Sequence, residues 1–167
     1  SRAGVEAAGF AIVEGSTPSL LLDGSALITG EVARGTDFEN GFSMHEALRN
    51  GAWTPDPLIM DDQALIVNVR DKGLVILTGC GHAGIVNIVR HAQRITGVAR
   101  VHAVVGGFHL SGRAFAASIA PTATALHEIG PALLVPGHCT GWTAIHQIAR
   151  TMPEAFIPNS VGTTLML

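Results

Sequence analysis

Three histidines stand in equivalent places in this sequence of 167 residues: each follows a short apolar run and lies in a turn that contains glycine. They are His82 in LVILTGCGH, His109 in VHAVVGGFH and His138 in ALLVPGHC. Imidazole is the commonest protein ligand for a metal ion and a frequent acid or base in catalysis. Three imidazoles in matching positions therefore indicate a metal site or a catalytic site.

The spacing of these histidines indicates how the fold would bring them together. Successive histidines lie 27 and 29 residues apart, about the length of one strand followed by one helix. We expect strands at 63–69, 74–77, 101–105 and 133–135, and helices at 85–95, 119–129 and 143–151. Because the carboxyl ends of parallel strands lie along one edge of a sheet, His82, His109 and His138 would share one cleft.

The rest of the chain is expected to add short strands and one long excursion. Residues 10–13, 19–22, 26–29 and 163–167 have the composition of strands. Residues 34–58 are polar and contain glycine and proline, and an excursion of that length predicts a functional loop or a lid. A helical turn is expected within it, at 44–49. Pro121 should lie near the first turn of its helix. Trp142 should share one apolar face of the last helix with Ile145, Ile148 and Ala149.

The candidate metal ligands are His82, His109, His138 and Cys80. Imidazole and thiolate suit zinc or iron, whereas calcium and magnesium prefer oxygen ligands. Each of the two cysteines, Cys80 and Cys139, lies within two residues of one of these histidines. That placement favours metal or redox chemistry in a reducing compartment over a structural disulfide.

The other histidines lack comparable surroundings. His91, His127 and His146 fall within predicted helices and are expected on solvent-exposed faces, and His45 and His102 have no supporting context. Among the carboxylates, Glu31, Asp61 and Asp62 lie nearest a strand end or a turn, where ordinary turn residues are expected. None of these residues is predicted to take part in chemistry.

A nucleotide site is an alternative interpretation of the segment from Gly79 to Gly84, because it fits the pattern G-x-G-x-x-G between a strand and a helix. A dinucleotide fold also requires an acidic residue about 20 positions further on, to bind the ribose hydroxyls. The sequence has no Asp or Glu from 92 to 126. The dinucleotide pattern is therefore incomplete.

Size and composition indicate one globular domain spanning 1–167. Hydrophobic residues make up 47% of the sequence and charged residues 14%, which is enough apolar material for a packed core. The net charge of −3 gives no basic surface for nucleic acid or an anionic membrane. No apolar run has the length of a membrane span, and no secretory signal is visible, so we expect a cytoplasmic protein.

Five segments in one order resemble a branch of the metallo-β-lactamase superfamily, the branch of dihydropterin-methyl-(ribofuranosyl)aminobenzene-phosphate synthase from methanopterin biosynthesis. The resembling segments are residues 29–32 (TGEV) with Arg34, Thr36, Phe38 and Glu39, then 61–65 (DDQAL), 73–87 (GLVILTGCGHAGIVN), 106–110 (GGFHL) and 136–141 (PGHCTG). The resemblance implies an α/β fold that forms part of an αββα sandwich, with one or two divalent ions, zinc or iron, at the sheet edge. It also implies a metal-dependent hydrolase, in which activated water attacks an ester, amide or phosphoester bond of a small-molecule substrate.

The resemblance further implies roles for single residues. His138 matches the late metal histidine of the superfamily. The turn that carries Cys80 and His82 matches the position of a bridging or second-site ligand, usually Asp, and we favour His82 as the ligand. His109 matches a histidine expected to contact the substrate or the developing oxyanion rather than to hold the metal.

The superfamily's first ligand cluster, H-x-H-x-D-H, does not occur in this sequence. The chain therefore resembles the C-terminal portion of the fold, and an intact site would require the N-terminal half or a homo-oligomer partner. A sheet that lacks its partner layer would leave an apolar face to be covered. The isolated chain would then be inactive, and a non-catalytic half-domain that binds a partner or a lone metal is the alternative function.

Overall fold

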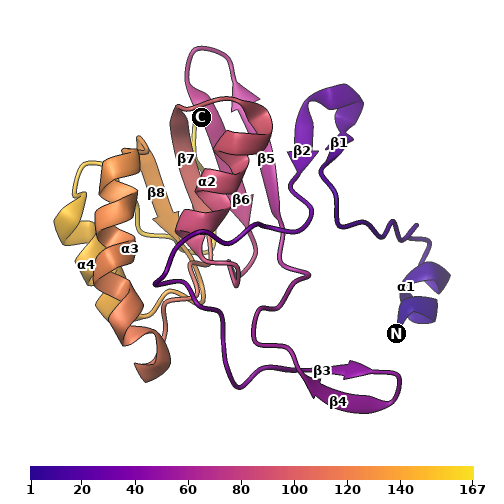
Figure 1. Ribbon diagram of the computed structural model, residues 1–167. Helices are drawn as coiled ribbons and strands as arrows, with labels where there is room; N and C mark the ends of the chain where they lie inside the picture. The colour runs from indigo at the N-terminus through magenta and orange to yellow at the C-terminus, as the bar shows by residue number, and fades with distance from the viewer.

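The computed structural model describes residues 1–167 as a mixed α/β fold built around one six-stranded sheet (Figure 1). Across the sheet the strands lie in the order β1 (Ser19–Leu21), β2 (Ala26–Ile28), β5 (Ala64–Val69), β6 (Gly73–Thr78), β7 (Val101–Gly106) and β8 (Leu133–Pro136). The first four are antiparallel, whereas β6, β7 and β8 run parallel. The predicted fold class and the predicted parallel strands are confirmed.

Helices provide the crossover connections that parallel strands require. Helix α2 (Ile85–Thr96) joins β6 to β7, α3 (Ala116–Ile129) joins β7 to β8 after the short 3-10 turn η2 (Arg113–Phe115), and α4 (Trp142–Thr151) follows β8. The buried stripe of α2 consists of apolar residues at helical spacing, and Gly97 ends the helix in the left-handed region at φ 69°. None of the helices combines the length and the apolar character that a membrane crossing requires.

The main core lies between one face of the sheet and the helices. Strand register aligns Ile66 with Ile76, and Val104 with Leu134, and all four side chains are buried. They belong to a cluster of 23 buried apolar residues that includes the inner faces of α2, α3 and α4. This packing fixes the carboxyl ends of β6, β7 and β8 relative to one another.

The opposite face of the sheet is apolar as well, but it is only partly covered. Register aligns Ile28, Leu65, Leu77 and Val105 across neighbouring strands on that face. Leu77 is 37% exposed, and the other three are half-buried. A row of large apolar side chains in contact with solvent is the feature that a missing packing layer would leave.

The 34–58 excursion contains a hairpin instead of the helical turn expected at 44–49, so that prediction was wrong. Strands β3 (Glu46–Arg49) and β4 (Ala52–Pro55) pair with each other and stand apart from the main sheet (Figure 1). They are joined by Asn50 and Gly51, whose φ values are 52° and 82°. Asn-Gly is the pair that a two-residue turn with positive φ prefers, and it overrides the weak helical pattern.

Four smaller predictions were also wrong. Residues 10–13 and 163–167 form no strand, because no neighbouring strand offers them a ladder; a short helix α1 (Arg2–Ala7), capped by Ser1, precedes the first of these segments. Helix α3 begins at Ala116, so Pro121 lies in its interior rather than in its first turn. Trp142 is 74% exposed, and Ala144 and Ile148 are the buried residues of α4 instead.

Candidate functional site

The loops that follow β6, β7 and β8 pack against one another at the carboxyl edge of the sheet. The backbone N–H of Gly107 donates to the carbonyl of Gly79 at 2.8 Å, and the N–H of Gly137 donates to the carbonyl of Gly106 at 2.6 Å. These contacts continue the parallel ladder into the turns. The loops that carry His82, His109 and His138 are thereby brought together at the edge where they were expected.

Within this edge, Cys80, His138 and Cys139 form a compact group of metal-binding side chains. Their ligand atoms all lie within 4.8 Å of one another, and Cys80 Sγ lies 3.0 Å from His138 Nε2. Zinc binds sulfur at about 2.3 Å and imidazole nitrogen at about 2.0 Å, so its ligands in a tetrahedral site are about 3.3–3.8 Å apart. The two sulfurs and the imidazole nitrogen therefore have the chemistry and the spacing of three ligands in the tetrahedral coordination of an ion such as zinc or iron.

Cys139 links all three loops. Its Sγ accepts a hydrogen bond from the backbone N–H of His109 at 3.2 Å and donates one to the carbonyl of Cys80 at 3.1 Å. Burial raises the pKa of the Cys139 thiol, and the neighbouring Cys80 adds to this effect. A cation in the group would favour the thiolate, since metal binding displaces the thiol proton. Both cysteines are free thiols in the structure.

His82 and His109 form a second pair beside this group. Their rings are 4.5 Å apart and nearly perpendicular, at 85°. His82 Nδ1 also lies 3.9 Å from the Asp62 carboxylate. Of the expected ligands, Cys80 and His138 are therefore brought together with Cys139, whereas His82 pairs with His109.

His109 is held in an unusual environment. Its backbone has φ 51°, and its ring packs against Phe42 and Phe115 at centroid distances of 6.3 and 4.7 Å. Both ring nitrogens are buried without a hydrogen-bond partner. Burial lowers the pKa of His109, the neighbouring His82 lowers it further, and Asp62 acts in the opposite direction. The ring is therefore neutral near pH 7, with one N–H available to donate.

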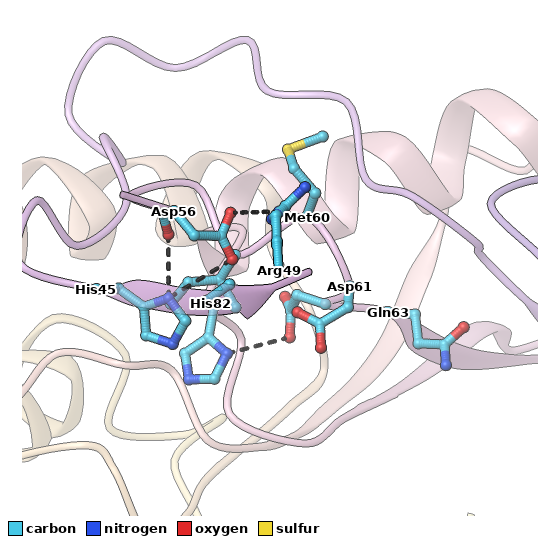
Figure 2. Close-up of a pocket in the computed structure, with 10 residues that line it drawn as sticks. His45, Arg49, Asp56, Met60, Asp61, Gln63 and His82 are labelled. Carbon is cyan, nitrogen blue, oxygen red and sulfur yellow. Dashed lines mark hydrogen bonds and ion pairs between the residues drawn. The ribbon is translucent and has the colours of Figure 1, made fainter. Parts of the chain in front are cut away.

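His82 lies between two cavities. A small cavity of about 190 Å³ is lined by both His82 and His109, together with Phe108 and Phe115. A larger cavity of about 570 Å³ is lined by His82, by Asp62 and by residues of the β3–β4 hairpin segment (Figure 2). His138 borders a third cavity, of about 590 Å³, on the side of α4. The three histidines thus share one edge of the sheet, but only His82 and His109 line a common cavity, and His138 lines a separate one.

Several residues of this region had no predicted role. Figure 2 shows His45 and Arg49 on either side of Asp56, at 3.6 and 3.3 Å from its carboxylate, where they line the larger cavity. Cys139 was recognised only as a neighbour of His138, and that adjacency was the available signal. His45 and Asp56 come together through the hairpin, which the sequence interpretation had placed as a helical turn.

The exposed position expected for His91 was wrong. His91 is 6% exposed, and its Nδ1 accepts a hydrogen bond from the backbone N–H of Ala33 at 3.2 Å. The loop before the excursion crosses α2 at this point and covers the ring. His127 and His146 lie on exposed faces, as expected.

The excursion is tied to the start of α2, beside the His82 turn. The Glu39 carboxylate accepts hydrogen bonds from the backbone N–H groups of Val86 and Asn87, both at 2.9 Å. Glu39 thereby replaces the side-chain cap that Gly84 cannot supply. A Cβ at Gly84 would lie 2.4 Å from the Glu39 carboxylate carbon, which explains this glycine without a nucleotide. The N–H groups of Val86 and Asn87 at this helix start are therefore occupied by a carboxylate of the chain itself.

The chain is similar in sequence to two curated proteins. No family model matches the chain. It is 38% identical over 109 residues to 7,8-dihydropterin-6-methyl-4-(β-D-ribofuranosyl)-aminobenzene-5'-phosphate synthase of Methanocaldococcus jannaschii. The match covers 65% of this chain and 36% of that protein. It is also 27% identical over 141 residues to an uncharacterised protein of the same organism, covering 84% of this chain and 49% of the relative.

Among solved structures, the chain resembles Tm1679, a metal-dependent hydrolase of the β-lactamase superfamily. The TM-score is 0.79 and the identity 27%, and the match covers 94% of this chain and 58% of Tm1679. The chain thus spans about half the length, or less, of the curated relatives it matches. In fold and sequence it is similar to the metallo-β-lactamase superfamily, in the branch that resembles the dihydropterin-methyl-(ribofuranosyl)aminobenzene-phosphate synthase.

Proposed function

We propose that this chain carries part of the active site of a metal-dependent hydrolase. The observation that supports this function best is the group of Cys80, His138 and Cys139, whose ligand atoms lie within 4.8 Å of one another at the carboxyl edge of the sheet. The similarity to a metal-dependent hydrolase with a TM-score of 0.79 supports the same function.

Cys80, His138 and Cys139 would hold a divalent zinc or iron ion. Such an ion supplies Lewis acidity and lowers the pKa of water toward neutrality, so that hydroxide becomes available for attack on an ester, amide or phosphoester bond. The two thiols are half-buried and His138 is exposed, so an ion held by the three residues would lie near the surface, within reach of solvent. Three protein ligands would leave a fourth position for water or substrate, as in a catalytic zinc site.

His82 and His109 would act on the substrate side of the site. A neutral imidazole donates through one nitrogen and accepts through the other, so His109 can stabilise negative charge that develops on a substrate oxygen. Both of its nitrogens lack protein partners. His82 opens onto the 570 Å³ cavity, which has the size of a pocket for a small molecule. The β3–β4 hairpin would form the outer wall of that pocket.

Metal content measured on the purified chain tests this proposal. Elemental analysis is expected to find zinc or iron in the wild type, and less in His138→Ala and Cys139→Ser. His146→Ala is the matched control, because His146 is an exposed histidine on α4 outside the group. Equal metal content in all four proteins would refute the ligand assignment. Turnover of p-nitrophenyl acetate and bis(p-nitrophenyl) phosphate then tests hydrolysis separately.

The half-exposed sheet face favours a second candidate function. The row of Ile28, Leu65, Leu77 and Val105 requires a cover, which the N-terminal half of the same fold or a second copy of the chain would supply. The chain would then be a non-catalytic half-domain that binds a partner, with or without a lone metal. Metal binding without turnover would support this second function over the first.

Light scattering with size-exclusion chromatography tests whether the face is covered by a second copy. A dimer that becomes monomeric in Leu77→Lys is the expected result. Leu48→Lys is the control, because Leu48 is 59% exposed on the separate hairpin. A wild-type chain that is monomeric at all concentrations would exclude self-association and leave the N-terminal half as the partner.

A further inference from the structure

A small basic cavity lies on the side of α2, apart from the metal-binding group. Its volume is about 180 Å³, and it is formed between the loop at 33–35 and α2. The lining residues are Ala33, Arg34, Gly35, Asn87, Arg90, His91 and Arg94. None of them lines either cavity beside His82. The basic cavity is therefore separate from the proposed substrate pocket.

Three arginines gather at this cavity without a carboxylate partner. Arg34, Arg90 and Arg94 contribute to the lining, which includes no Asp or Glu, and no carboxylate lies within 4.0 Å of any of the three guanidinium groups. The whole chain has ten Lys and Arg residues and a net charge of −3. Gathering three of its cations around one hollow is therefore not a consequence of an excess of basic residues.

Two carboxylates interact electrostatically with these arginines, and both are already engaged in hydrogen bonds. Asp62 and Glu39 act on Arg34, and Glu39 also acts on Arg90. Asp62 accepts a hydrogen bond from the backbone N–H of Ala83, and Glu39 accepts two from backbone N–H groups at the start of α2. Both carboxylates therefore moderate the positive potential of the cavity without filling it.

The arginines are also positioned rather than dispersed. Arg90 and Arg94 are one helical turn apart on α2, and like charges at this spacing destabilise a helix. Arg94 Nη2 lies 2.6 Å from His91 Nδ1, whereas both Nη groups of Arg34 donate to backbone carbonyls, those of His82 and Leu58. The contact with His91 holds Arg94 near the loop, and Arg34 contributes charge rather than free Nη donors. A bound anion would relieve the repulsion between Arg90 and Arg94.

We propose that this cavity binds a tetrahedral oxyanion, namely a phosphate group. Arginine presents paired N–H donors that match the oxygens of phosphate, and such charged hydrogen bonds are about twice as strong as neutral ones. A cavity of about 180 Å³ is smaller than the pockets of drug-sized ligands and suits one phosphate group. The phosphate is either free in solution or the terminal group of a larger ester.

Calorimetric titration of the full chain with inorganic phosphate tests the proposal. The wild type is expected to bind phosphate. The double variant Arg90→Gln/Arg94→Gln should bind it at least about ten-fold more weakly, because the loss of even one charged hydrogen bond, worth about 1.5–3 kcal/mol, lowers the affinity by that factor. Arg70→Gln is the matched control, because Arg70 is an exposed arginine outside the cavity. Circular dichroism of each variant verifies the fold.

Two further titrations locate the site and its source of phosphate. Cys139→Ser should bind phosphate as the wild type does, which separates this site from the metal-binding group. Glycerol 3-phosphate that binds more tightly than inorganic phosphate would indicate a terminal phosphate of a larger ligand, and equal affinity would indicate the free ion. Undetectable binding at millimolar phosphate, or equal affinity in the wild type and the double variant, would overturn the proposal.

Discussion

Cys139 packs against Gly107 so closely that a Cβ at Gly107 would lie 2.4 Å from the cysteine sulfur. The same Cβ would lie 2.8 Å from the carbonyl oxygen of Gly79 and 3.0 Å from Cα of Cys80. Separations below 3.0 Å do not occur for real Cβ atoms, and two of these neighbours are backbone. The loops after β6, β7 and β8 can therefore meet only because residue 107 has no side chain.

Gly107→Ala is expected to push Cys139 out of the metal-binding group and to lower both stability and metal affinity. Overpacking of this kind costs about 1–3 kcal/mol in the free energy of unfolding. Urea denaturation and zinc titration measure the two effects. Gly79→Ala is the matched control, because a Cβ at Gly79 meets nothing within 4 Å. If the two variants matched in stability and zinc affinity, the close packing at Gly107 would have no consequence.

The identity of the ligand in the β6 turn gives a second prediction. Cys80→Ser is expected to lower zinc affinity by about ten-fold or more, because a thiolate within the group of three donors is lost. His82→Ala should leave zinc affinity unchanged, because the His82 ring pairs with His109 and Asp62 instead. Competition with a chromophoric zinc chelator measures both. The reverse order of affinities would restore His82, the residue favoured from sequence, as the ligand.

The parallel half of the fold could be predicted from sequence because pattern and packing agree there. The apolar stripe of α2 from Ile85 to Ala92 faces the core, and Gly97 ends the helix where its sequence position indicates. The hairpin at Asn50 and Gly51 was missed although its turn signal was present, because the flanking residues are exposed on both strands and carry no clear alternation. The loop at Ala33 covers His91 through a contact between residues that are distant in the sequence. No local sequence pattern predicts such a contact.

The candidate site could be predicted in part. Sequence position predicts that residues 82, 109 and 138 lie at one edge of the sheet, because each follows a parallel strand. It does not decide which side chains point toward one another. That depends on close approaches such as Cys139 to Gly107, and on the left-handed backbone of His109, neither of which has a sequence pattern.

The attachment of the excursion to α2 depends on Asn87. This side chain is 1% exposed, and its Oδ1 accepts hydrogen bonds from the N–H groups of Gly35 and Thr36 at 2.8 and 3.0 Å. Its Nδ2 donates to the carbonyl of Ala83 at 2.9 Å. Asn87→Ala removes the partner of the buried Ala83 carbonyl and of the partly exposed N–H groups of Gly35 and Thr36, so the free energy of unfolding should fall by about 1–3 kcal/mol.

Chemical denaturation of Asn87→Ala measures this loss. Asn68→Ala is the matched control: Asn68 is an exposed asparagine on β5, and its variant should change stability by about 0.5 kcal/mol or less. Limited proteolysis should also cleave the 34–58 segment faster in Asn87→Ala than in the control. Stability and cleavage equal to the control would mean that Asn87 does not anchor the excursion.

The buried His91 makes stability depend on pH in a defined direction. Burial lowers the pKa of His91 from its ordinary 6.5, Arg94 lowers it further, and the Thr29 carbonyl acts in the opposite direction. Below pH 6.5 the unfolded chain therefore binds a proton at this residue that the folded chain does not. The free energy of unfolding consequently falls as the pH drops, by at most about 1.4 kcal/mol per pH unit.

Urea denaturation between pH 7.5 and 5.5 measures this effect. The free energy of unfolding should depend less on pH in His91→Gln than in the wild type. His127→Gln is the control, because His127 is an exposed histidine of α3, and its variant should keep the wild-type pH dependence. An unchanged slope in His91→Gln would assign the pH dependence to other groups.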